Sequence, residues 1–211
     1  DGSYIAHEDV AVFKHENINI DEEMQPMEVV KAERGKTMED GVKFHKKPLN
    51  MQIKDVLYVD EKGRFILAII RGDFDVNEIK LNHLTGSIEL RAATEEEIVE
   101  KLHSFPGFIS PVGIKEKKES GVELIIVADQ SLRTVVNAYG GNNVKFEDLL
   151  NVNIDRDYKA DIEGDIALAA AGCETVDGKG KLIEKKGVEV GNIFQLGYHY
   201  STKMKDATFV D

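Results

Sequence analysis

The sequence predicts an α+β fold, with a curved, mixed, mostly antiparallel sheet that is barrel-like and has helices packed outside it. Three observations lead to this expectation. Residues 53–70 have the pattern of a two-stranded hairpin, residues 122–127 form a near-continuous apolar strand, and several short helices with capping signals lie between the strands.

The predicted hairpin is the segment around which the chain is organised. Along residues 53–59 the side chains alternate, so that one face carries Ile53, Asp55, Leu57 and Val59 and the other carries Lys54, Val56 and Tyr58. Residues 60–63 supply turn chemistry, and the unbroken apolar run 65–70 is typical of a strand covered on both faces. Lys54 stands out, because an ammonium among apolar neighbours must extend to solvent, find a partner or take part in chemistry.

Three short helices follow from capping signals. Asp75 with Glu78 has capping-box spacing for a helix from Val76, and residues 94–97 repeat that spacing before an apolar stripe. Thr37 with Asp40 predicts another helix over residues 37–44. Short strands are expected at residues 87–90 and 151–154, and a loop at 139–143. Residues 131–138 are compatible with helix or strand.

Composition excludes several classes of protein. Of 211 residues, 42% are hydrophobic and 31% charged, which is typical of a soluble globular protein. No apolar run approaches the roughly 20 residues of a membrane helix, so we expect no membrane contact and a cytoplasmic location. One cysteine excludes an internal disulfide. The net charge of −12 has the wrong sign for a protein that binds a phosphate backbone alone.

Several separate blocks carry a family resemblance. They are QIKDVLYVDEKGRFILAIIRGDFDVNEIKLNHL at residues 52–84, AATEEE at 92–97, PGFISPVGI at 106–114, IIVADQS at 125–131, NVNIDRD at 151–157 and GVEVGNIFQLGYHYSTK at 187–203. From about Lys36 to its end, the chain resembles the editing insertion of bacterial-type prolyl-tRNA synthetases. Since the sequence lacks an initial methionine and stops inside a motif, we expect it to be part of a longer chain.

The resemblance implies an organisation and an activity. Residues 1–35 would be a connecting arm, 36–158 the editing domain with the fold of free-standing trans-editing deacylases, and 159–211 the return segment toward the synthetase core. The implied reaction is hydrolysis of alanyl-tRNA(Pro), and the implied partners are the tRNA(Pro) acceptor end carrying alanine and the rest of a synthetase chain, whose parent enzyme would be a homodimer. No cofactor is implied.

Two residues match positions of catalytic importance in the resemblance. Lys54 would hold the phosphate of the terminal adenosine or polarise the ester carbonyl; the alternative is a lysine at the rim of a half-buried strand. Asp129 would orient water or the substrate amino group; the alternative is an ordinary helix N-cap, and both can hold.

Three further residues are expected to bind substrate. Gly107 and Ser110 lie in the loop that resembles the amino-acid pocket, where Ser110 replaces a glycine usual in the family; the alternative is an ordinary Pro-Gly turn. Asp148 stands where the family commonly has a histidine. Because an aspartate is not the same neutral donor or base near pH 7, this departure bears on both selectivity and rate.

No metal is predicted. The acidic run 155–165 lacks the glycine and terminal glutamate of a calcium loop, and Cys173 lacks a second cysteine, since Val176 takes that place.

Two functional interpretations remain: an editing hydrolase, or a catalytically decayed insert that is structural or positions tRNA. An independent trans-editing protein is less favoured, because the 187–203 block resembles a chain that continues.

Overall fold

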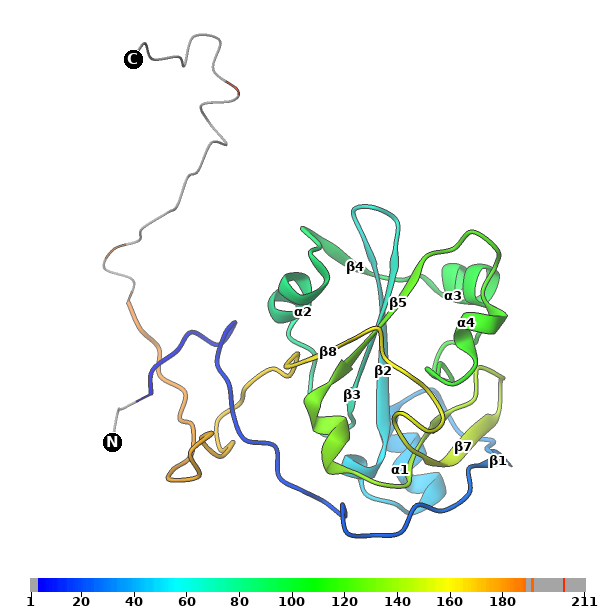
Figure 1. Cartoon of the computed structure of the whole chain (residues 1–211), viewed down its shortest axis with the longest axis horizontal. Helices are drawn as coiled ribbons and strands as arrows, with labels where there is room; N and C mark the ends of the chain where they lie inside the picture. The colour runs from blue at the N-terminus through cyan, green and yellow to red at the C-terminus, as the bar shows by residue number, and fades with distance from the viewer. Residues whose placement is uncertain (1–3, 189–190, 192–202, 204–211) are drawn as a thin grey trace.

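The computed structural model describes residues 4–188, 191 and 203, and two sheets organise them (Figure 1). The strands of the larger sheet, in spatial order, are β4 (Leu90–Ala92), β2 (Ile53–Asp60), β3 (Phe65–Arg71), β5 (Leu124–Asp129) and β8 (Ile162–Gly164). Those of the smaller sheet are β1 (Glu28–Lys31), β7 (Glu147–Val152) and β6 (Ala138–Gly141). Short helices connect the strands: α1 (Met38–His45), η1 (Leu49–Met51), α2 (Glu78–Thr85), α3 (Glu95–Leu102), α4 (Ile114–Lys117) and η2 (Gln130–Thr134).

The strand pairing confirms a mixed, mostly antiparallel α+β fold. β2 pairs antiparallel with both β3 and β4, and β7 pairs antiparallel with β1 and β6. β5 pairs parallel with β3 and β8. The barrel-like part of the prediction is not confirmed, because no sheet among the described residues closes on itself. An isolated bridge between Gln52 and Tyr139 is where the two sheets meet.

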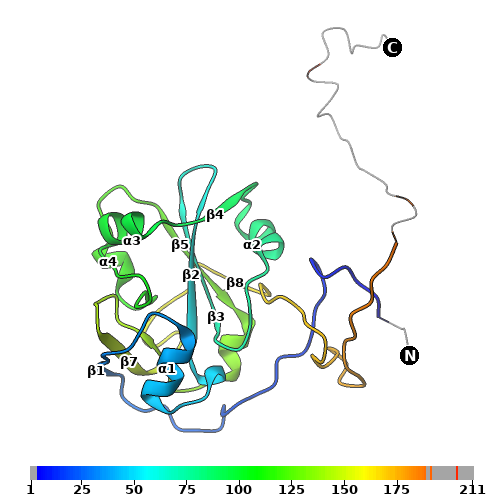
Figure 2. The same ribbon diagram turned by 180° about the vertical axis from the view of Figure 1, so that it is seen from behind.

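Two apolar cores cover the two faces of the larger sheet. Phe65, Leu67 and Ile69 of β3 face a core that includes residues of the smaller sheet, α3 and α4. The intervening side chains of β3 face a second core with α2 and the N-terminal segment around Phe13. Figures 1 and 2 show α2 on one side of the larger sheet and α3 and α4 on the other. β3 is therefore covered on both faces, as its unbroken apolar run predicts.

The local signals predict most elements, and the structure corrects several of their bounds. Thr37 with Asp40 and Thr94 with Glu97 form complete capping boxes. The helix expected from Val76 begins later, because Asn77 accepts the first backbone donors in place of Asp75. The strand expected at 87–90 is β4, shifted toward Ala92.

A further correction concerns residues 130–143, which contain both a 3-10 helix and a strand. The ambiguous segment forms η2 and then turns into β6, so the loop expected at 139–143 is largely strand. The strand expected at 151–154 is the end of β7. The capped helices and the hairpin are local features, whereas β6 depends on pairing with a strand later in the chain.

The predicted boundaries at residues 35 and 158 stay a prediction. β1 lies before the first boundary and β8 after the second, and each pairs with a strand of the central segment. The 187–203 block falls almost wholly outside the described residues. Within the described part of the chain, no helix is long and apolar enough to span a membrane.

Candidate functional site

A small cavity opens where the start of β2, the end of β6 and the loop after α3 converge. Its volume is about 80 Å³, well below the roughly 300–1,000 Å³ of sites for drug-sized ligands. We call it the Gly107 cavity. It is lined by Arg34, Lys36, Thr37, Met38, Gln52, Ile53, Asp55, Gly107, Ile109 and Gly141.

Two glycines allow the backbone to form this wall. Gly107 has φ of 82°, and a Cβ there would lie 2.7 Å from the Cα of Lys36. A Cβ on Gly141 would lie 2.3 Å from the carbonyl oxygen of Phe108. Both distances are shorter than a real Cβ tolerates, so glycine is required by close backbone approach, and at Gly107 also by the left-handed conformation.

The buried residue Asn143 holds the cavity loop in shape. Its side-chain amide donates to the carbonyl oxygens of Ser110 and Val112, and its Oδ1 accepts from the Ser110 backbone at 3.0 Å. The Ser104 hydroxyl donates to the same Oδ1 at 2.8 Å. No role is predicted for Asn143 from the sequence, although the Gly-Gly-Asn-Asn segment at residues 140–143 is a visible signal.

Ser110 is part of this loop but does not line the Gly107 cavity. The residue is 2% exposed, and its hydroxyl accepts from the Val112 backbone at 3.3 Å. The side chain therefore stabilises the turn. Of the predicted substrate-binding residues, Gly107 alone is among the residues that line this cavity.

Asp148 is completely buried and fully paired. Arg34 donates to both of its carboxylate oxygens, at 2.6 Å each, and the Nε2 of His45 lies 2.7 Å from Oδ2. The Arg34 guanidinium also lies 4.4 Å from the centroid of the Phe108 ring. Since Arg34 lines the Gly107 cavity, Asp148 shapes it from behind by fixing this arginine.

Lys54 lies on the opposite face of β2 from the Gly107 cavity. Its ammonium forms an ion pair with Asp75 and donates to the carbonyl oxygen of Phe74 at 3.3 Å. The side chain is 25% exposed. The neighbouring residue Asp55 points to the cavity instead, as the alternation along a strand requires.

Asp129 also lies away from the cavity and acts as a helix cap. Its Oδ1 accepts from the Ser131 backbone at the start of η2, and its Oδ2 accepts from the Ile166 backbone, both at 2.8 Å. The residue is wholly buried. The structure thus separates Lys54 and Asp129 from Gly107, by placing them on the other face of the larger sheet.

Comparisons with known proteins place this geometry in a family. Residues 32–154 match the aminoacyl-tRNA editing domain. The chain belongs to the aminoacyl-tRNA editing domain family. The match covers the Gly107 cavity together with β2 to β7, so the cavity is a feature of the editing domain itself.

Curated relatives are bacterial proline–tRNA ligases. The chain is 35% identical to that of Bacillus subtilis over 211 residues, which is 100% of this chain and 36% of the relative. It is 39% identical to that of Fusobacterium nucleatum over 191 residues, covering 90% of this chain and 32% of the relative. The chain therefore spans about a third of the length of these relatives.

Solved structures share the fold. A candidate trans-editing enzyme for prolyl-tRNA synthetase superposes with a TM-score of 0.50 at 20% identity, covering 60% of this chain and 76% of that one. A hypothetical protein superposes with a TM-score of 0.56 at 20% identity, covering 67% of this chain and 91% of that one. At this identity the likeness establishes the fold alone.

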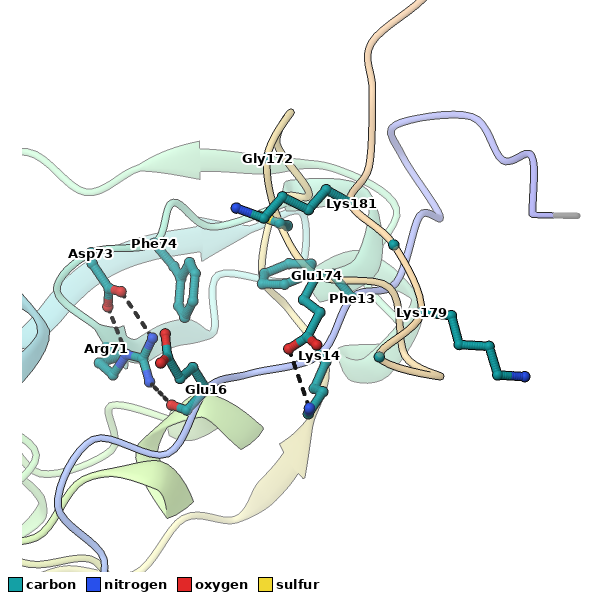
Figure 3. A pocket seen from close by; sticks show the side chains of 13 residues that line it. Phe13, Lys14, Glu16, Arg71, Asp73, Phe74, Gly172, Glu174, Lys179 and Lys181 are labelled. Carbon is teal, nitrogen blue, oxygen red and sulfur yellow. Dashed lines mark hydrogen bonds and ion pairs between the residues drawn. The ribbon is translucent and has the colours of Figure 1, made fainter. Parts of the chain in front are cut away.

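A larger cavity, about 520 Å³, lies between the N-terminal segment, the end of β3 and the turn at residues 172–181 (Figure 3). Arg71 forms an ion pair with Asp73 and stacks 4.6 Å from the centroid of the Phe74 ring, while Lys14 pairs with Glu174. None of the predicted site residues lines it. Because these charges compensate one another, we assign no ligand to this cavity.

A three-residue cluster could hold a cation by distance alone. Ligand atoms of His15, Asp129 and Asp165 all lie within 4.8 Å of one another. However, both Asp129 oxygens accept backbone hydrogen bonds, and Lys80 donates to Asp165 at 2.8 Å. Desolvation lowers the pKa of His15. Since Lys80 already pairs with Asp165 and both Asp129 oxygens accept backbone hydrogen bonds, we assign no metal to this cluster.

Proposed function

We propose that this chain is the editing module of a prolyl-tRNA synthetase and hydrolyses the ester bond of alanyl-tRNA(Pro). The observation that carries the proposal is the Gly107 cavity, a small space inside the segment that matches the editing domain. Its walls include backbone at Gly107 and Gly141, which cannot be displaced as easily as flexible side chains. A wall of this kind favours a small aminoacyl group over a larger one.

The need for such a cavity follows from the size of the two amino acids. The aminoacylation site of a synthetase, which is built for proline, cannot exclude the smaller alanine. Missing methylenes in an apolar pocket change the binding free energy by only about 1–3 kcal/mol each. A second site that admits alanine and excludes proline corrects the error. An aminoacyl ester is already activated, so positioning and an activated water are sufficient for its hydrolysis.

Within this proposal, the residues have different tasks. Gly107 forms the wall of the aminoacyl site, and Ser110 and Asp148 support that wall without contacting the ester. Lys54 is assigned to the phosphate of the terminal adenosine rather than to the carbonyl, because its ammonium lies across β2 from the cavity. Asp129 is a positioning residue, since both of its oxygens already accept protein hydrogen bonds.

The proposed partners are the acceptor end of tRNA(Pro) carrying alanine and the remainder of a synthetase chain, in a cytoplasmic homodimer. The relatives support this assignment, since they are bacterial proline–tRNA ligases of which the chain spans about a third. The net charge of −12 of the whole chain favours placing most contacts with the tRNA backbone on the other parts of the enzyme.

Deacylation of pre-formed Ala-tRNA(Pro) tests the function, with Pro-tRNA(Pro) as the matched substrate. The test uses the synthetase that carries this domain, as wild type and as Lys54→Ala. We expect the wild type to clear the alanyl ester faster than the uncatalysed rate and to spare the prolyl ester, and Lys54→Ala to slow clearance at least tenfold. Clearance of the alanyl ester at the uncatalysed rate by the wild type contradicts the proposal.

The second candidate function is a catalytically decayed insert. The observation in its favour is Asp148, which occupies the position of a histidine in the resemblance and has both oxygens bound to Arg34. Under this alternative, Lys54→Ala leaves the alanyl ester lifetime unchanged, while deletion of residues 36–158 lowers prolylation or stability. The two candidates therefore give opposite results in the same assay.

A further inference from the structure

Asp55 is an isolated carboxylate on the wall of the Gly107 cavity. It lies on the apolar face of β2 between Ile53 and Leu57, opposite Ile69 of β3. Its Oδ1 is shielded from solvent and has no hydrogen-bond partner among the described residues.

The buried aspartates in the described part of the chain all have hydrogen-bond partners. Asp148 binds Arg34, Asp129 accepts two backbone N–H groups, and Asp60 accepts from the side chain and backbone of Arg64. Buried polar groups are nearly always hydrogen-bonded, since a charge without a partner is costly. A carboxylate that the protein leaves without a partner, facing a cavity, is available to a ligand.

The cations around the cavity do not neutralise Asp55. The Arg34 guanidinium is committed to Asp148, and the Lys36 ammonium is paired with Glu95 at 2.7 Å on the surface. Burial raises the pKa of the Asp55 carboxyl well above its ordinary value. An incoming cation favours the ionised carboxylate and offsets this desolvation.

We propose that Asp55 binds the α-ammonium group of the aminoacyl ester that enters the Gly107 cavity. The inference rests on the proposed editing function and names the group that holds the substrate's charged end. A primary ammonium is a compact cation with several N–H donors, and it is the one charged group that an alanyl ester carries into so small a space. A charge-assisted hydrogen bond to the Asp55 carboxylate would fix the orientation of the ester.

Binding of two hydrolysis-resistant analogues to the full chain tests the inference. One is 3′-alanylamino-3′-deoxyadenosine, which carries the ammonium, and the other is the lactyl amide, which has a hydroxyl in its place. Dissociation constants are measured by calorimetry for the wild type, Asp55→Asn and Asp55→Glu. The control is Asp155→Asn, which removes the same charge from an exposed carboxylate paired with Arg133 outside the cavity.

We expect the wild type and Asp155→Asn to prefer the alanyl analogue by about tenfold or more, as suits a charge-assisted hydrogen bond. Asp55→Asn should reduce that preference to within about twofold, and Asp55→Glu should retain part of it, because the carboxylate is kept. Circular dichroism verifies that each variant is folded. A wild type without preference, or a preference that survives Asp55→Asn, overturns the inference.

The outcomes separate this inference from the editing function. If the synthetase hydrolyses Ala-tRNA(Pro) but the preference is independent of Asp55, editing stands and the ammonium site is wrong. If the preference depends on Asp55 but no hydrolysis occurs, the ammonium site stands and the hydrolase assignment is wrong.

Discussion

Two aspartates on either side of the Gly107 cavity wall have opposite environments. Asp148 is wholly buried and bound by Arg34 and His45, whereas the buried oxygen of Asp55 has no protein partner. The first environment is that of a carboxylate used to hold the structure together. The second is costly to the folded state and is retained where a ligand makes use of it. The contrast shows that burial alone does not mark a carboxylate as a candidate for ligand binding, because the absence of a protein partner is what separates Asp55 from Asp148.

The largest expected effect on stability comes from removing Asp148, the aspartate that has protein partners. Asp148→Ala leaves the Arg34 guanidinium buried without its counter-ion, which typically destabilises a protein by about 3–5 kcal/mol. Chemical denaturation should show this loss in the free energy of unfolding. The control is Glu174→Ala, which removes an exposed pair with Lys14 and should cost less than about 1 kcal/mol. An Asp148→Ala cost as small as that of the control would show that the buried pair does not stabilise the fold.

The second prediction tests whether the close approach of Gly107 to the backbone of Lys36 forms the wall of the Gly107 cavity. Gly107→Ala combines a left-handed φ of 82° with a Cβ 2.7 Å from the Lys36 backbone. Gly63→Ala has a similar φ of 76° but nothing within 4 Å of its Cβ. We expect a cost of about 2–4 kcal/mol for the first and about 1–2 kcal/mol for the second.

Both glycine variants place an alanine in the left-handed conformation, but only Gly107→Ala adds a close contact of its Cβ. The difference between their free energies of unfolding therefore separates the cost of crowding from that of backbone strain. Thermal and denaturant unfolding both measure it, and the deacylation rate of Gly107→Ala should fall while that of Gly63→Ala should not. Equal costs for the two would mean that the loop moves freely away from Lys36.

The third prediction concerns Asp55, the aspartate whose buried oxygen has no protein partner. Because the folded-state pKa of Asp55 is raised, the folded protein binds the carboxyl proton of Asp55 more tightly than the unfolded chain does. The stability that this protonation contributes is present at low pH and is lost as the pH rises through the folded-state pKa. Asn does not titrate, so the Asp55→Asn variant does not lose this stability as the pH rises. We expect a gain of about 1–2 kcal/mol at pH 7, shrinking toward zero below the ordinary aspartate pKa of 3.8, together with loss of editing.

Unfolding free energies measured from pH 3 to pH 8 provide the check. Asp155→Asn is again the control, and its stability should not rise with pH relative to the wild type, because pairing with Arg133 lowers the pKa of Asp155. A destabilising effect of Asp55→Asn at pH 7 would show that the carboxylate has a structural partner.

The sequence predicts the parts of this arrangement that are local. The β2–β3 hairpin and the capping boxes at Thr37 and Thr94 depend on residues within a few positions of one another, and the structure confirms them. Residues 139–143 are predicted to be a loop, whereas most of them belong to the strand β6. Gly141 is needed instead for packing against the backbone of Phe108, a contact that no local pattern contains.

The site was harder to predict for the same reason. Arg34 and His45 lie 114 and 103 residues from Asp148 in the chain, so its pairing depends on the β1–β7 register and the position of α1. Asp55 was visible on the apolar face of the hairpin, between Ile53 and Leu57. Lys54, one position earlier, is the more conspicuous residue of the pattern, although an aspartate on the more apolar face is the stronger anomaly.

The smallest expected effect comes from a surface counterpart of the Arg34–Asp148 pair. Arg91 donates to both carboxylate oxygens of Glu97, at 2.8 and 2.6 Å, so this pair is also bidentate, although it uses Nη1 and Nη2 where Arg34 uses Nε and Nη2. The hydrogen bond from Arg91 lowers the pKa of Glu97 to about 2. A quarter of the Glu97 side chain and half of the Arg91 side chain are exposed, so solvent screens the attraction.

Glu97→Gln removes the charge but keeps the capping box with Thr94, because glutamine serves equally in that position. We expect a cost of about 0.5 kcal/mol at pH 7. Since the folded-state pKa is lowered, this contribution is present above the ordinary value of 4.5 and is lost as pH falls toward 2. Glu97→Ala, which also removes the cap, should cost about 1 kcal/mol more. If Glu97→Gln instead cost as much as Asp148→Ala, burial would not be what distinguishes the two arginine pairs, and the contrast between satisfied and unsatisfied carboxylates would lose its physical basis.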